Sequence, residues 1–242
     1  MRRTKIICTM GPATDNEDVL RDLMLNGMDV ARLNFSHGSH EEALERINRI
    51  KKVRDELNIP VAILLDTKGP EVRIKDFKEG KVELKEGQKF TLCTDDVVGD
   101  ENQVSITYAN LPNDVKVGSK ILIDDGLIEM EVISVKNSKI LCKVKNGGVV
   151  SNKKGVNVPN VALSMPYMSK KDIDDILFGI EQDVDFIAAS FVRTADDIRE
   201  IKTLLRDNGG RDIRIIAKIE NAEGVDNIDD IIRETHGIMV AR

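Results

Sequence analysis

An alternation of apolar strands and amphipathic helices, interrupted once, is the feature that most constrains the fold. Apolar runs predict strands over 5–10, 29–37, 61–65, 185–191, 213–220 and 237–242. Between them, apolar residues recur at helical spacing, as in Ile173, Ile176, Leu177 and Ile180. Strands that alternate with helices are typical of a parallel sheet, so the chain is expected to be an α/β protein.

The interruption runs from about Val72 to Val158. Short segments such as Lys81–Leu84 and Ile128–Val132 alternate polar and apolar residues, and turn signals such as Asp124-Asp125-Gly126 separate them. This section has no helical period. We therefore predict a small all-β, barrel-like domain that is inserted after the third strand.

Composition excludes several classes of function. The net charge of -6 argues against a general nucleic-acid surface or an anionic-membrane surface. The 3 cysteines form no Cys-x-x-Cys pair, so neither a zinc site nor a disulfide framework is predicted. The sequence shows no apolar run near the length of a membrane span and no signal peptide. A cytoplasmic protein without a membrane or nucleic-acid partner is expected.

Polar side chains gather where the predicted strands end. Arg32, Asn34 and Ser36 share one face of the second strand, where burial would be costly unless they bind something. The third strand ends in the polar stretch 65–73, and the fifth ends in Lys218 and Glu220, which point the same way. The carboxyl ends of parallel strands meet at one edge of a sheet, so these side chains are expected to form one site.

The residue types at this edge indicate phosphoryl transfer. Arg and Lys suit phosphoryl oxygens, and an isolated carboxylate suits a divalent cation that keeps its waters. The oxygens of Asn, Ser, Asp and Thr together suit a monovalent cation. Plainer interpretations stay open: Ser36 and Thr67 could cap loops, and His37 could be structural. His40 and His236 are expected to be surface residues.

Four segments resemble the motifs of the pyruvate kinase family: 31–38, 65–73, 154–157 and 215–221. The resemblance extends over the whole chain, in the family's order and spacing. It implies a TIM barrel that begins in residues 1–69 and continues in 167–242, with residues 70–166 as an inserted β-barrel lid domain. It also implies transfer of a phosphoryl group from phosphoenolpyruvate to ADP, which gives pyruvate and ATP in the last step of glycolysis, with Mg²⁺ and K⁺.

The resemblance assigns roles to individual residues. Lys218 would stabilise the phosphoryl group in flight and Arg32 would bind the phosphoryl group of phosphoenolpyruvate; both are the implied catalytic and substrate-binding residues. Glu220 would bind Mg²⁺. The implied K⁺ ligands are Asn34, Ser36, Asp66 and Thr67. The implied nucleotide-binding residues are Asn34, His37, Arg73 and Lys154.

Glu71 occupies the position at which an acidic residue accompanies potassium dependence in the family, so potassium dependence is expected. The sequence departs from the family at its end. A TIM barrel has eight strands, whereas six are predicted, and the family's C-terminal domain, which binds effectors and builds a homotetramer, has no counterpart. We therefore expect a fragment that is inactive alone. Two alternatives stay open: another enolate-handling TIM-barrel enzyme, and a non-catalytic nucleotide- or metal-binding fragment.

Overall fold

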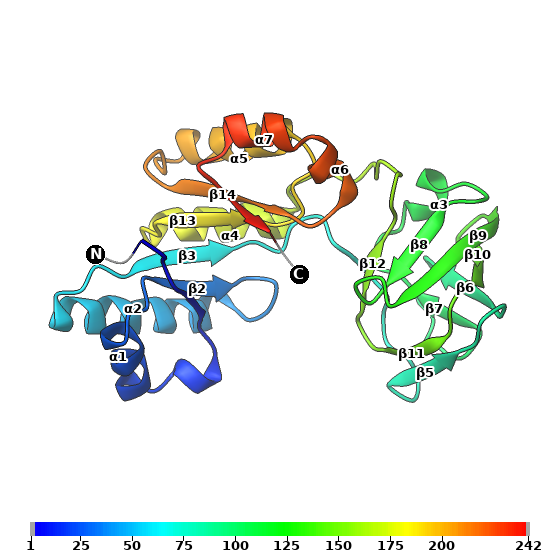
Figure 1. Ribbon diagram of the computed structural model, residues 1–242, viewed down its shortest axis with the longest axis horizontal. Helices are drawn as coiled ribbons and strands as arrows, with labels where there is room; N and C mark the ends of the chain where they lie inside the picture. Colours follow the sequence, from blue (N-terminus) through cyan, green and yellow to red (C-terminus); the bar gives the residue numbers. More distant parts are fainter. Residues whose placement is uncertain (1–2, 241–242) are drawn as a thin grey trace. The chain divides into compact units, whose positions relative to one another are not determined.

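The computed structural model describes residues 3–240, which divide into two compact units. One unit, here called the α/β unit, runs to Pro70, resumes over Tyr167–Glu220 and continues from Gly224. The other, here called the β unit, comprises Glu71–Pro166 and Asn221–Glu223. Figure 1 shows both units.

The α/β unit is built on a 6-stranded sheet with the order β1-β2-β3-β13-β14-β15. Its strands are β1 Ile7–Thr9, β2 Val30–Asn34, β3 Ala62–Asp66, β13 Phe186–Ala189, β14 Arg214–Ile219 and β15 Gly237–Val240. Every neighbouring pair is parallel. This confirms the predicted α/β class. The sixth strand was predicted to continue through Ala241 and Arg242, which lie outside the described residues.

Helices follow the strands of this sheet. Their bounds are η1 Pro12–Thr14, α1 Glu17–Leu25, α2 His40–Leu57, α4 Lys170–Glu181, α5 Ala195–Asp207, α6 Ala222–Asp226 and α7 Ile228–Glu234. In Figure 1, α1 and α2 lie below the strands and α5 and α7 above them. Asn16, Ser39 and Ser169 cap α1, α2 and α4 by accepting main-chain N–H bonds.

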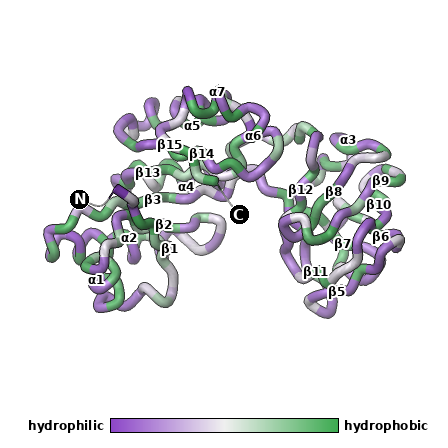
Figure 2. The backbone as a smooth tube through the Cα atoms, viewed as in Figure 1, coloured by the Kyte–Doolittle hydropathy of each residue, from purple (hydrophilic) through white to green (hydrophobic). Residues whose placement is uncertain are grey.

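The core of this unit forms where the strands meet the apolar stripes of the helices. Ile47 and Ile50 of α2, and Ile176 of α4, are fully buried against strand residues such as Ile63 and Ile187. Polar residues (purple) predominate on the rest of α2 and α5 in Figure 2. Burial of one stripe per helix holds each helix against the sheet. Within the described residues, no helix is both long and apolar enough to cross a membrane.

The β unit contains a 7-stranded sheet with the order β4-β12-β8-β9-β10-β6-β7 and a 2-stranded sheet, β11-β5. The bounds are β4 Val72–Arg73, β5 Lys81–Leu84, β6 Lys89–Cys93, β7 Gln103–Ser105, β8 Lys120–Ile123, β9 Ile128–Lys136, β10 Lys139–Val144, β11 Gly148–Ser151 and β12 Gly155–Asn157. Alternate strand residues such as Phe90, Leu92, Ile121 and Met130 fill its core.

Two local predictions were wrong. The β unit includes one helix, α3 Leu111–Asp114, which at 4 residues is too short to show a helical period. Ser36 does not continue the second strand, which ends at Asn34. The Asn34 side-chain Oδ1 accepts a hydrogen bond from the Ser36 N–H at 3.0 Å, and this local bond turns the chain away from the sheet.

Candidate functional site

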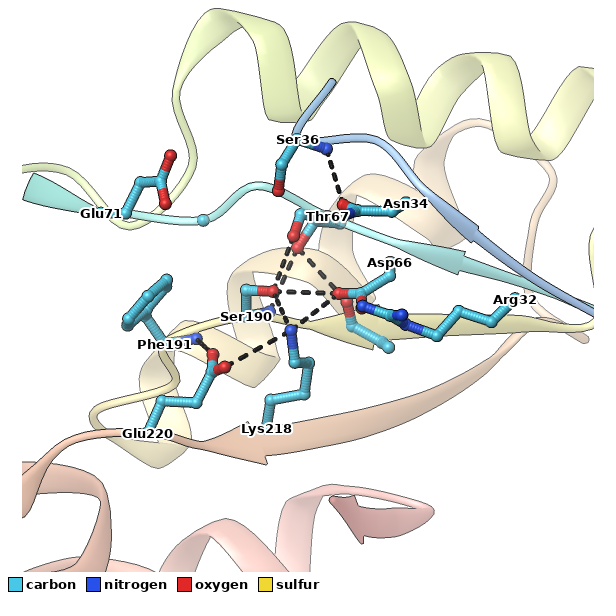
Figure 3. Close-up of polar contacts among 12 residues, drawn as sticks. Arg32, Asn34, Ser36, Asp66, Thr67, Glu71, Ser190, Phe191, Lys218 and Glu220 are labelled. Atoms are coloured by element: carbon cyan, nitrogen blue, oxygen red, sulfur yellow. Dashed lines mark hydrogen bonds and ion pairs between the residues drawn. The ribbon is translucent and has the colours of Figure 1, made fainter. Parts of the chain in front are cut away.

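The candidate site lies at the carboxyl ends of four neighbouring strands, β2, β3, β13 and β14 (Figure 3). Asp66 is in register with Asn34 on one side and with Ala188 on the other. Ala189 is in turn in register with Ala217, the residue before Lys218. Parallel register therefore brings the polar ends of these strands together, as the sequence predicts.

Asp66 is the centre of the site. Its side chain is 1% exposed and contacts two cations: Arg32 Nε lies 2.6 Å from Oδ2, and Lys218 Nζ lies 2.9 Å from Oδ1. A buried carboxylate is tolerated only where charges or donors compensate its lost hydration. Asp66 thereby fixes a guanidinium and an ammonium group next to each other.

Three oxygen-bearing groups orient the Lys218 ammonium. Besides Asp66, it donates to Ser190 Oγ at 2.8 Å and lies 3.5 Å from Glu220 Oε1. The Lys218 side chain is only 11% exposed. A flexible lysine chain is therefore held in one place at the edge of the sheet, where a developing negative charge would meet it without rearrangement.

Glu220 is positioned by the main chain of the neighbouring turn. Its Oε2 accepts a hydrogen bond of 2.8 Å from the Phe191 N–H (Figure 3). Phe191 has a φ of 55°, in the left-handed region that residues other than glycine rarely occupy. Such a conformation costs of order 1–3 kcal/mol and concentrates at functional sites. Here it directs a main-chain donor toward the carboxylate.

Ser190 is a site residue that the sequence analysis missed. Its hydroxyl lies 3.0 Å from Asp66 Oδ1 and 2.6 Å from the Thr67 carbonyl, in addition to the bond from Lys218. Ser190 directly follows β13. The rule that located Asp66 and Lys218, a polar residue after an apolar parallel strand, would also have located Ser190.

Two further positions complete the surroundings of the site. The Arg32 guanidinium donates from Nη1 to Thr9 Oγ1 at 2.7 Å, a contact that the sequence analysis did not predict. Gly69, with a φ of 68°, lies so close to Ser190 that an added Cβ would approach the Ser190 carbonyl oxygen to 2.6 Å. Glycine is therefore required where the chain turns past the end of β13.

The four residues implied as K⁺ ligands lie at the ends of β2 and β3. Asn34 is exposed and Ser36 is half-buried, whereas Asp66 and Thr67 are buried. Thr67 Oγ1 lies 3.2 Å from the Ser190 nitrogen and 3.3 Å from the Ala188 carbonyl oxygen. These contacts hold Thr67 against the end of β13. His37 is exposed on the loop that follows β2.

Glu220 is the carboxylate that could bind a divalent cation. No cluster of three or more His, Cys, Asp and Glu side chains suited to a metal exists among residues 3–240. Mg²⁺ nevertheless fits the site, because it is often bound through one or two carboxylates, with waters and substrate phosphates as its other ligands. The Glu220 side chain is 16% exposed, so the carboxylate is accessible.

The other predicted site residues, Glu71, Arg73 and Lys154, belong to the β unit. Arg73 Nη2 lies 2.7 Å from Glu71 Oε2, and this ion pair raises the pKa of the Arg73 guanidinium. Arg73 Nη1 also donates to the Lys153 carbonyl at 2.8 Å. Lys154 forms an ion pair of 3.0 Å with Asp124. Both cations are therefore oriented by acidic residues of their own unit.

His40 is 38% exposed at its side chain, as expected of a surface residue, but it also makes contacts that were not predicted. Its ring stacks on Phe178 with centroids 4.4 Å apart, and its Nε2 lies 2.7 Å from Asp175 Oδ1. The partner residues are 135 positions or more along the chain, so local sequence carries no sign of the contact. His236 is exposed as expected, but its Nδ1 accepts a hydrogen bond of 3.0 Å from the Ile215 N–H.

Comparisons with known proteins agree on one family. The family model described as pyruvate kinase, barrel domain, matches residues 1–242. The chain is 49% identical over 243 aligned residues to a pyruvate kinase of Clostridium perfringens and 54% identical over 243 to one of Geobacillus stearothermophilus. All of the chain is covered, but it spans only 51% and 41% of these two relatives. The chain belongs to the pyruvate kinase family.

Proposed function

We propose that the protein transfers a phosphoryl group from phosphoenolpyruvate to ADP and so gives pyruvate and ATP. The observation that carries this proposal is the pair of cations on one buried carboxylate: Arg32 and Lys218, both bound to Asp66. Phosphoryl transfer depends on positioning and on electrostatic stabilisation of the charged oxygens. Two oriented cations at a strand edge meet both requirements.

Arg32 and Lys218 have different tasks in this proposal. A guanidinium has five N–H donors, and the Arg32 side chain is 25% exposed, so donors remain for the phosphoryl group of phosphoenolpyruvate. Lys218 lies deeper, and its ammonium would offset the charge that develops on the equatorial oxygens of the phosphoryl group in flight. Asp66 and Ser190 prevent the lysine chain from moving away during transfer.

Metal ions are part of the proposal. Glu220 would hold Mg²⁺, which neutralises phosphate charge when it is bound. Asn34, Ser36, Asp66 and Thr67 would hold K⁺, because their amide, hydroxyl, carboxylate and carbonyl oxygens suit a weakly hydrated cation. We also propose that the nucleotide phosphates are bound by Asn34, His37, Arg73 and Lys154.

We also propose that the α/β unit is part of a TIM barrel and that the β unit is its inserted domain. The 6 parallel strands follow one another across the sheet in chain order, as the first strands of a TIM barrel do. The β unit begins directly after β3, where the family has its inserted lid domain. A cytoplasmic homotetramer is proposed with the activity.

The proposal is tested by measuring pyruvate formation by the protein expressed from its full-length gene. With phosphoenolpyruvate, Mg²⁺ and K⁺ present, we expect pyruvate only when ADP is added, with one ATP formed for each pyruvate. Pyruvate release without ADP would contradict the proposal and indicate another enolate-handling enzyme. Nucleotide binding without turnover would indicate a binding protein.

A further inference from the structure

The loop after β2 is held through one peptide group that links two of the proposed K⁺ ligands. The Phe35 carbonyl and the Ser36 N–H belong to the same planar peptide unit. The carbonyl accepts a hydrogen bond of 2.8 Å from Lys171 Nζ, and the N–H donates to Asn34 Oδ1 at 3.0 Å. The bond from Lys171 therefore orients the peptide unit between Phe35 and Ser36, and the Asn34 side chain is hydrogen-bonded to the N–H of that unit.

Asp175 in turn orients Lys171. Its side chain is 1% exposed, and its Oδ2 accepts a bond of 2.6 Å from Lys171 Nζ, one helical turn earlier on α4. Its Oδ1 lies 2.7 Å from Nε2 of His40, the first residue of α2. One buried carboxylate therefore contacts the α2 end of the loop directly, at His40, and the β2 end through Lys171.

Ring contacts fix the same loop from within. Phe35 is 4% exposed, and its ring centroid lies 5.9 Å from that of Phe178 and 6.1 Å from that of His40. The Phe35 N–H is also bound, at 2.9 Å, to the Asp66 carbonyl. The ring and the N–H of Phe35 are thus held in place without Lys171. Only the tilt of the following peptide unit, whose carbonyl Lys171 binds, is left to be fixed.

We infer that Lys171, oriented by Asp175, is a positioning residue that sets the Asn34–Ser36 turn for a monovalent cation. This inference rests on the proposed function, which makes these residues K⁺ ligands. Lys171 is 43% exposed and could extend into water, yet its ammonium forms a charge-assisted bond to a main-chain carbonyl. Without that bond, the peptide unit would tilt more freely and Asn34 would lose part of its orientation.

The test measures the K⁺ concentration that gives half-maximal activity in the full-length protein. For Lys171→Met we expect this concentration to rise about tenfold, as loss of one bond to a charged group predicts. The rate at saturating K⁺ should stay within about twofold of the wild type. Lys171→Arg should restore most of the K⁺ affinity. Asp175→Asn, which keeps the side-chain volume, should raise the half-saturating concentration in the same direction.

Lys170→Met is the matched control, because Lys170 is the exposed neighbour on the same helix. It should leave the half-saturating K⁺ concentration unchanged. A second measurement does not need turnover: KCl should raise the thermal unfolding midpoint of the wild type and of Lys170→Met above the midpoint in tetramethylammonium chloride at equal ionic strength. The KCl effect should be smaller in Lys171→Met.

The outcomes separate the inference from the proposed function. A wild type that is stabilised by KCl but forms no pyruvate would overturn the proposed function, while the unfolding midpoints still test Lys171. Equal K⁺ dependence of Lys171→Met and the wild type would overturn the inference. So would a lower maximal rate without any change in the half-saturating K⁺ concentration, because that result indicates a general structural role.

Discussion

Lys218 Nζ lies 2.9 Å from Asp66 Oδ1 although 152 residues separate the two in the chain. They come from β14 and β3, and β13 lies between these strands. Ser190, at the end of β13, bonds to both and so bridges the gap. The ion pair is therefore a property of three neighbouring strand ends, and its strength depends on the register of the parallel sheet.

Lys218→Met tests the role of this ammonium group. We expect the rate of ADP-dependent pyruvate formation to fall by on the order of 10²–10³ or more, as happens when one donor to a developing charge is removed. Far-UV circular dichroism should stay unchanged, because Arg32 still compensates Asp66. The exposed Lys170→Met serves as the control. A folded Lys218→Met variant with wild-type activity would exclude Lys218 from the reaction.

Ser190→Ala tests the bridge. Lys218 and Asp66 would each lose a buried hydrogen-bond partner, so the free energy of unfolding should fall by about 1–3 kcal/mol. Urea denaturation measures the change. Thr203→Ala, at an exposed position of α5, should change the free energy of unfolding by only about 0.5 kcal/mol or less. Equal effects of the two substitutions would show that the Ser190 hydroxyl is energetically neutral.

Much of this site could be predicted because one rule applies to each parallel strand separately. A polar residue at the end of an apolar strand lies at the carboxyl edge, and this located Asp66 and Lys218 without knowledge of their partners. Arg32 was located by the period of two, which places it on one face of its strand with Asn34. Helix caps such as Ser169 are equally local, since donor and acceptor are three residues apart. Local signals thus give the position of a side chain along the sheet edge.

The partners of these side chains could not be predicted, because they depend on packing. Nothing near His40 in sequence indicates Asp175 or Phe178, which reach it only when α4 packs beside α2. Ser36 was assigned to the second strand because it continues the alternation of polar and apolar residues. In the structure the Asn34 side chain starts a turn at this point instead, and the strand ends. Ser190 was missed although the same local rule applies to it, and its bonds to Asp66 and Lys218 form only when the three strand ends lie side by side.

Glu220→Gln tests the proposed magnesium ligand. The amide keeps an oxygen for the Phe191 N–H but loses the charge that attracts a divalent cation. We expect the half-saturating Mg²⁺ concentration for pyruvate formation to rise by about tenfold or more, in line with the losses measured for weaker metal-site changes. Glu181→Gln, an exposed position on α4, is the control. An unchanged Mg²⁺ requirement in Glu220→Gln would assign the metal to other residues.

Replacement of K⁺ tests the oxygens at the ends of β2 and β3. With tetramethylammonium at the same ionic strength, so that screening is unchanged, we expect the rate to fall by about tenfold or more, because Asp66 and its oxygen-bearing neighbours lose the cation that they are proposed to bind. Readdition of K⁺ should restore the rate. Full activity without any small monovalent cation would contradict both the proposed K⁺ site and the expectation drawn from Glu71.

His236 predicts a pH dependence of stability that is independent of activity. Although the residue is exposed overall, partial burial of its ring lowers its pKa from the ordinary 6.5, with Arg214 and Lys202 acting in the same direction. The unfolded chain therefore binds a proton at a higher pH than the folded one, so stability is complete above about pH 6.5 and is lost as the pH falls toward the folded pKa. Protonation would also remove Nδ1 as acceptor for the Ile215 N–H.

His236→Asn isolates this contribution, because an amide oxygen can accept the same main-chain bond and does not titrate. Urea denaturation at pH 7.5 and pH 5.5 should show a smaller loss of stability for the variant than for the wild type. Lys202→Met, which removes one of the two neighbouring cations, should weaken the dependence in part. Equal losses in His236→Asn and the wild type would mean that groups other than His236 govern stability in this pH range.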